Sequence, residues 1–74
     1  MDYKELIERA KQGRSVNSTA QALGVPLSTF QRYEKGERFP DFDIGLRIVQ
    51  AAGVDLATAF VIIALAQRDS KRQT

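Results

Sequence analysis

The placement of four glycines limits the fold of this 74-residue chain more than any other feature. Gly13, Gly24, Gly36 and Gly53 each follow a stretch in which apolar residues recur every three or four positions, the spacing of one face of an α-helix. Glycine readily adopts the left-handed conformation that ends many helices. The pattern predicts helices over about 3–12, 17–23 and 42–52, a third helix that begins at Pro26 or Leu27 and runs to about residue 35, a fifth from after Asp55 to about residue 68, and no strand.

The residues that precede these segments are good helix caps. Asp2, Asp41 and either Ser15 or Asn17 have short polar side chains that can accept hydrogen bonds from the first unpaired backbone amides. Pro26 suits a first helical position because its φ is already set. A chain of this length has room for one small domain. We therefore expect a compact all-α fold of five helices.

Aromatic side chains are expected mainly in the core. In the fourth segment, Phe42, Leu46 and Val49 have the spacing of an inward face. Phe39 is the exception, because it stands beside Pro40 in an extended link and is the aromatic residue most open to solvent.

The composition argues against catalysis. The chain has no cysteine and no histidine, which removes thiolate nucleophiles, cysteine–metal clusters and the commonest general base. Asp41 and Asp43 are explained by helix capping and by the favourable charge of a first helical turn, and two carboxylates alone do not form a metal site. Glu34 is expected to bond to an arginine or to backbone near its helix end. We predict no enzyme activity, no metal and no cofactor.

Residues 17–36 have the pattern of a helix-turn-helix, two short helices joined by a turn that contains glycine. Ala20 is small where two helices cross, Gly24 allows the positive φ of the turn, Val25 fills the core beneath it, and Phe30 anchors the second helix. Residues 9–38 also carry six basic and two acidic side chains. Such clustered positive charge is typical of a nucleic-acid-binding face.

The segment Ala20–Gly36, AQALGVPLSTFQRYEKG, resembles the core of lambda-repressor-like domains of the Cro/XRE family. The resemblance continues in Arg38-Phe39-Pro40-Asp41 and in the fourth segment, which closes with Gly53-Val54, and it covers about residues 3–60. It implies five helices and sequence-specific binding to double-stranded DNA, usually as a two-fold dimer. A domain of this kind that stands alone is similar to small phage or prophage repressors.

The resemblance assigns DNA contacts to the second helix of the motif and to its flanks. Arg32 and Gln31 are expected to contact bases or phosphates, and Leu27 a thymine methyl group. Whether Arg14 also contacts DNA stays open. The candidate DNA-binding residues are Asn17, Ser18, Leu27, Ser28, Thr29, Gln31, Arg32, Lys35 and Arg38.

Phosphate contacts are expected on both flanks of that helix. Lys35 and Arg38 lie at its end and beyond it, where side chains usually position a protein on the duplex. Val16 stands where the family often has a phosphate-binding glutamine. We therefore assign that role to the neighbouring residues Asn17 and Ser18.

The fifth segment is apolar on nearly every side. The run from Leu56 to Ala66 contains only Thr58 as a polar residue, whereas a surface helix normally keeps one polar face. A small core buries one face, so the other is expected to meet a second copy of the chain. The alternative is a helix wrapped more deeply into its own domain. We divide five residues between core and dimer interface: Phe60, Val61, Ile62, Ile63 and Leu65.

These inferences predict a DNA-binding domain over residues 1–69, with a dimerisation helix over about 55–68 and a flexible tail over 70–74. The expected function is a cytoplasmic transcriptional repressor that binds a palindromic operator as a homodimer. The alternative is an antitoxin-type DNA-binding protein whose fifth helix or tail also binds a toxin. The chain begins with charged residues and its longest apolar run is too short to span a membrane, so neither a signal peptide nor a membrane partner is expected.

Overall fold

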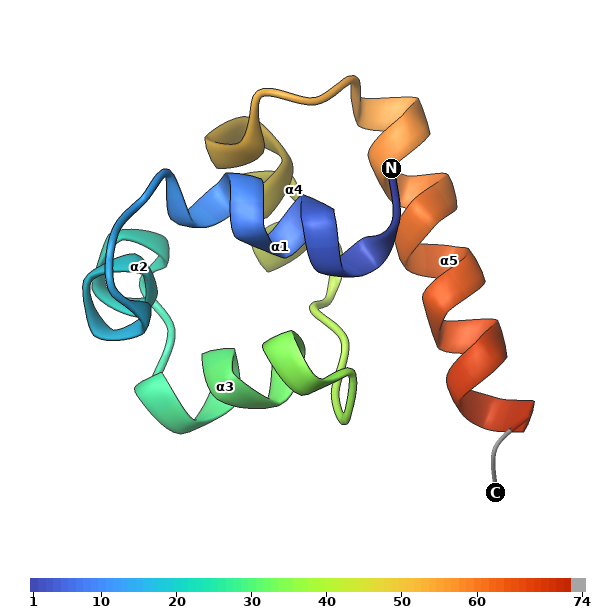
Figure 1. Cartoon of the computed structure of the whole chain (residues 1–74), viewed down its shortest axis with the longest axis horizontal. Helices are drawn as coiled ribbons and strands as arrows, with labels where there is room; N and C mark the ends of the chain where they lie inside the picture. The colour runs from blue at the N-terminus through green and yellow to red at the C-terminus, as the bar shows by residue number, and fades with distance from the viewer. Residues whose placement is uncertain (73–74) are drawn as a thin grey trace.

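The computed structural model describes residues 1–72, which form five α-helices and no strand. The helices are α1 (Tyr3–Lys11), α2 (Val16–Leu23), α3 (Leu27–Lys35), α4 (Phe42–Ala52) and α5 (Leu56–Arg72). Helices α1 and α4 pack against each other at the centre, α2 and α3 lie on one side of them, and α5 lies on the other (Figure 1). The predicted all-α, five-helix fold class is confirmed.

The helix ends follow the predicted capping chemistry. Ser15, rather than Asn17, caps α2. The glycines after α2, α3 and α4 take positive φ as expected, but α1 ends earlier than predicted because Gln12 already has a left-handed φ of 55°. Four cap residues accept a hydrogen bond from the backbone N–H three positions later: Asp2, Ser15, Asp41 and Asp55.

Two groups of buried side chains form the core. The first includes Phe30 and Tyr33 of α3, and Phe30 has an exposed fraction of 0%. These two side chains hold the inner face of α3 against the rest of the domain, so that its opposite face points to solvent. The second group holds α5 against α1 and α4, and consists of Leu6, Val49, Ala59 and Ile63.

Two aromatic predictions were wrong, because Phe42 is exposed and Phe39 is half-buried. Phe42 is 71% exposed, and its ring stacks on that of Phe60 with centroids 5.4 Å apart. It begins α4, ahead of the positions that face the core, and the ring of Phe60 fills the space beside Gly45. Phe39 packs against the ring of Tyr3 at 5.2 Å. The extended link therefore turns its aromatic side chain inward.

Helix α5 is longer than predicted. It continues to Arg72 instead of ending near residue 68, so residues 70–72 of the predicted tail are helical. The residues after Ala66 include no glycine or proline that would end the helix. The remaining tail residues, 73–74, lie outside the described part of the chain, and the flexibility of the tail stays a prediction.

The Tyr3 hydroxyl joins the start of α1 to the end of α3. It donates a hydrogen bond to the carbonyl oxygen of Tyr33 at 2.8 Å, and burial of the phenol raises the pKa of Tyr3. Above about pH 10, the folded chain keeps this proton whereas the unfolded chain releases it. The resulting stability is fully present below about pH 10 and is lost as the pH rises further.

Replacing Tyr3 with phenylalanine is expected to cost about 1 kcal/mol of unfolding free energy at pH 7, the usual worth of a hydrogen bond. Above about pH 10, the unfolding free energy of the wild type should fall by about 1.4 kcal/mol per pH unit because of Tyr3. The variant has no ionisable group at this position and should show no such fall. Burial also raises the pKa of Tyr33, which is present in both proteins. In urea unfolding, the difference in unfolding free energy between the wild type and the variant should disappear near pH 11. An equal deficit at pH 7 and pH 11 would contradict the raised pKa of Tyr3.

Candidate nucleic-acid interface

A tight turn over residues 24–26 joins α2 to α3. Gly24 has a φ of 74°, and the N–H of Val25 bonds to the Ala20 carbonyl at 3.0 Å. Val25 packs against the core as predicted. From α4, the Arg47 guanidinium donates a hydrogen bond to the Leu23 carbonyl at 3.0 Å. The turn is thus held from beneath and from the side, which fixes the angle between the two helices.

Helix α3 presents one polar face to solvent. Ser28, Gln31 and Lys35 are exposed and follow one line along the helix, because they are spaced three and four residues apart. Leu27 and Arg32 are exposed on either side of that line. Leu27 is 41% exposed, which leaves an apolar side chain available to a ligand at the start of the helix.

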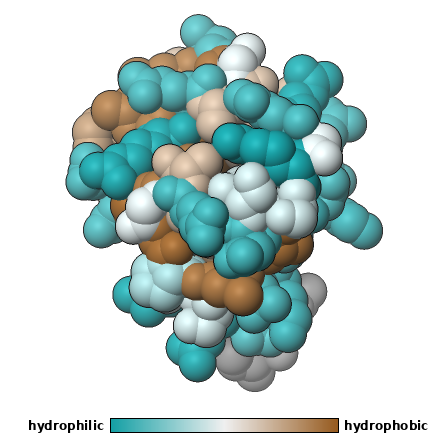
Figure 2. Space-filling view, turned by 90° about the vertical axis from the view of Figure 1, so that its left-hand side faces the viewer, coloured by the Kyte–Doolittle hydropathy of each residue, from teal (hydrophilic) through white to brown (hydrophobic). Residues whose placement is uncertain are grey.

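The other candidate DNA-binding residues lie on α2, on α3 and in the link after α3. Asn17 and Ser18 are exposed in the first turn of α2, and Arg38 is exposed in the link after α3. Thr29 is half-buried at the edge of the core. Eight of the nine candidates are therefore exposed. Figure 2 views the molecule from the α2 side, where hydrophilic side chains cover most of the surface and apolar patches lie between them.

The Lys11 ammonium ties α1 to α3. It lies 2.6 Å from the Glu34 carboxylate and 2.9 Å from the Glu8 carboxylate, and the hydrogen bond to Glu34 raises the pKa of Lys11. Glu34 therefore bonds to a lysine of another helix, and not to the arginine or nearby backbone expected from the sequence. The charges of Lys11 and Glu34 are satisfied by each other, so neither is left for DNA.

Two further cations of the basic segment are also engaged. Arg14 donates to the carbonyl oxygens of Lys11 at 2.9 Å and Ala10 at 3.2 Å, which caps the end of α1. The guanidinium of Arg9 lies 3.8 Å from the Glu5 carboxylate. The remaining cations of residues 9–38 make no ion pair with any carboxylate of the described residues, and all lie on α3 or just after it: Arg32, Lys35 and Arg38.

The outer side of α5 is apolar. Val61 is 57% exposed and Leu65 is 50% exposed, while Phe60 and Ile62 are half-buried. Ile63 has an exposed fraction of 5% and packs in the core of its own chain. Of the five residues divided between core and interface, Ile63 thus lies on the core side and Val61 and Leu65 on the outer side.

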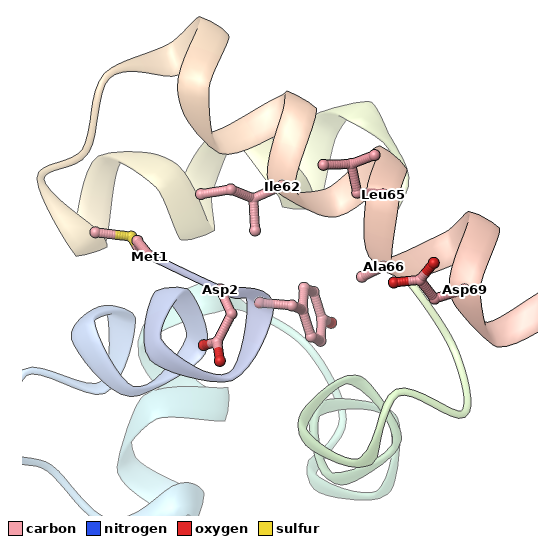
Figure 3. A pocket seen from close by; sticks show the side chains of 7 residues that line it. Met1, Asp2, Ile62, Leu65, Ala66 and Asp69 are labelled. Carbon is pink, nitrogen blue, oxygen red and sulfur yellow. The ribbon is translucent and has the colours of Figure 1, made fainter.

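Two open pockets flank Met1 along α5. One, of about 180 Å³, is lined by residues that include Met1, Leu65 and Asp69 (Figure 3). The other, of about 350 Å³, is lined by residues that include Met1, Ala57 and Val61. Across residues 1–72, no group of three or more histidine, cysteine, aspartate or glutamate side chains is placed to bind a metal ion. Both pockets lie along α5, and the carboxylates of Asp2 and Asp69 also line the first one.

Two short helices, a tight glycine turn and an outward polar face on the second helix define a helix-turn-helix domain; in motifs of this kind the second helix, which is α3 in this chain, is called the recognition helix. Comparison with known families agrees. Residues 7–59 match the family described as Helix-turn-helix domain, and the chain belongs to this family. Comparisons with curated proteins and with solved structures found no match. Within the described part of the chain, no helix is both long and apolar enough to cross a membrane.

Proposed function

We propose that this helix-turn-helix domain is a sequence-specific transcriptional regulator that binds double-stranded DNA as a homodimer and represses transcription. The observation that carries the proposal is the position of Arg32, Lys35 and Arg38, which lie on α3 or just after it and have no carboxylate partners among the described residues. Cations in this state are available to displace counterions from phosphates. The resemblance to lambda-repressor-like domains supports a phage or prophage repressor.

Each outward side chain of α3 has a matching group on DNA. The Gln31 amide matches the N6 and N7 atoms of adenine, the Arg32 guanidinium matches O6 and N7 of guanine, and the Leu27 side chain matches the methyl group of thymine. Lys35 and Arg38 follow these residues along the chain and contact phosphates. The first two turns of α3 therefore read the DNA sequence, and the residues at its end fix the position of the domain on the duplex.

The first turns of α2 and α3 supply further backbone contacts. Asn17 and Ser18 lie in the first turn of α2, where the helix dipole and unpaired amides favour a phosphate. Ser28 and Thr29 lie in the first turn of α3. Pro26 caps this helix but provides no side-chain hydrogen bond to its first amides. Hydroxyl groups at these positions can donate to phosphate oxygens.

The apolar outer side of α5 supports the dimer. A second copy of the chain that covers Val61 and Leu65 removes exposed apolar surface from water. A two-fold dimer places its recognition helices about 34 Å apart, one turn of B-DNA, and so requires a palindromic operator. Repression by occlusion needs only tight binding at a promoter and no catalytic step.

Selection from a random-sequence duplex library, followed by fluorescence anisotropy, tests the proposal. We expect a two-fold symmetric motif that binds at least about 100-fold more tightly than a random duplex, or about 2.7 kcal/mol. Equal affinity for selected and random duplexes would refute sequence-specific regulation. Failure to bind any duplex would refute DNA binding and would favour a protein-binding role for α5, as in the antitoxin alternative.

Replacing Arg32 with alanine is expected to weaken binding to the selected duplex by about 1–3 kcal/mol, or about 5- to 150-fold, and to relax the preference at one base pair. The unfolding free energy should change by less than about 0.5 kcal/mol, because Arg32 is exposed and unpaired with described carboxylates. Arg9→Ala, on α1, is the matched control and should leave both quantities unchanged. Equal losses on selected and random duplexes would make Arg32 a phosphate contact instead.

A further inference from the structure

The C-terminal turns of α5 lie beside the link that follows the recognition helix. Gln67 and Ser70 of α5 line an open groove of about 390 Å³ together with Glu37, Arg38 and Phe39 of the link. Figure 1 shows the corresponding arrangement, in which the last turns of α5 descend on the side of the molecule where α3 ends. Two segments that are distant in the sequence therefore meet at the edge of the proposed DNA face.

This end of α5 is basic. Residues 68–72 contain Arg68, Lys71 and Arg72 and a single carboxylate, that of Asp69. Asp69 lies on a different flank of α5 from the groove, where it lines the pocket beside Met1 (Figure 3). Arg68 is exposed and makes no ion pair with the carboxylates of the described residues. The positive charge of Arg68 is therefore available to a ligand.

We infer that the basic end of α5, defined as residues 68–72, is an additional contact to the DNA backbone. This inference rests on the proposed function and extends the phosphate contacts of Lys35 and Arg38 across the groove to a second helix. The occupant is the phosphodiester backbone, because residues 68–72 carry three cations against one carboxylate. The groove beside them is lined by Arg38 and by the hydrogen-bonding side chains of Gln67 and Ser70, as well as by Glu37 and Phe39.

The contact has a definite place on the operator. The outer side of α5 carries the proposed dimer interface, so the second recognition helix lies beyond α5. The basic end of α5 therefore faces the spacer between the two half-sites. Backbone contacts of this kind raise affinity on every DNA sequence and add to its salt dependence, but they do not read bases.

The test removes two of these cations and measures the effect on DNA affinity. The control removes two cations elsewhere on the chain. The variant is Arg68→Gln with Lys71→Gln, and the control is Lys4→Gln with Arg9→Gln on α1, which changes the net charge equally. Glutamine favours helix nearly as well as lysine and arginine do, and circular dichroism checks that both variants keep their helical content. Affinity is measured by anisotropy at several salt concentrations on selected and random duplexes.

The basic end of α5 should contribute to the slope of log affinity against log salt concentration. For two lost phosphate contacts per chain, and therefore four per dimer, the slope should become shallower by about 3.6, so that between about 50 and 200 mM salt the affinity falls about 150-fold less. The preference for the selected over the random duplex should not change, and the control should keep the wild-type slope. In the variant alone, ethylation of the spacer phosphates should no longer interfere with binding.

The outcomes separate this inference from the proposed function. Equal slopes for the wild type, the variant and the control would overturn the inference, while the preference for the selected duplex would still support regulation. A shallower slope in the control as well would also overturn it, because any cation would then have the same effect. A wild type that binds no duplex would overturn both the inference and the function.

Discussion

Replacing Phe30 with alanine should lower the unfolding free energy by about 3–5 kcal/mol, a large share of the stability of a small domain. The Phe30 side chain is fully buried, and it belongs to the same core group as Ile7, Leu23 and Ile48 of the other helices. Its removal leaves a cavity beneath the recognition helix. Thermal unfolding followed by circular dichroism should show a fall in Tm of at least about 12 °C.

Leu27→Ala on the same helix is the control for this effect. Leu27 is exposed, so its truncation should cost less than about 1 kcal/mol of stability. The Leu27→Ala substitution should instead weaken binding to selected duplexes that place a thymine methyl group against this side chain. Wild-type stability in the Phe30 variant would show that this ring does not anchor α3 in the core.

The helix ends could be predicted because each depends on a few adjacent residues. Asp2 and Asp41 cap the helices that follow them, and the glycines end α2, α3 and α4, as the sequence indicates. Ser15 and Asn17 are equally good caps by residue type. The choice of Ser15 places Val16 in the first turn of α2, where it packs against the core. Packing therefore selected between two caps that local chemistry does not distinguish.

Contacts between distant segments could not be predicted from local patterns. The hydrogen bond from Arg47 to the Leu23 carbonyl and the contact of Lys11 with Glu34 both join separate helices. The stacking of Phe42 on Phe60 likewise depends on a partner in another helix, α5. Periodicity does predict which residues of α3 face solvent, because that face follows from the helical repeat. Periodicity does not show which cations have carboxylate partners, because these pairs depend on the tertiary fold.

Aspartates at positions 61 and 65 are expected to abolish the proposed dimer. Val61 and Leu65 lie about one turn apart on the outer side of α5. In a single chain the new carboxylates of Val61→Asp with Leu65→Asp stay in water, so the domain should remain folded. In the dimer they would be buried without partners, which costs several kcal/mol for each ion. Sedimentation equilibrium should show a monomer.

The same double variant should bind the full operator about 10²- to 10⁴-fold more weakly, because the dimer makes contact with the second half-site an intramolecular event. Binding to a duplex with one half-site should change little, and this comparison distinguishes loss of the dimer from repulsion between carboxylates and phosphates.

The control is Gln50→Asp, which adds a carboxylate on the exposed side of α4 and not on α5. Its sedimentation and its affinity for the operator should match those of the wild type. Ile63 is unsuitable for this test, since an aspartate there would disrupt the core. If the double variant sediments and binds the operator as the wild type does, α5 does not form the dimer, and its apolar outer side must contact a different partner.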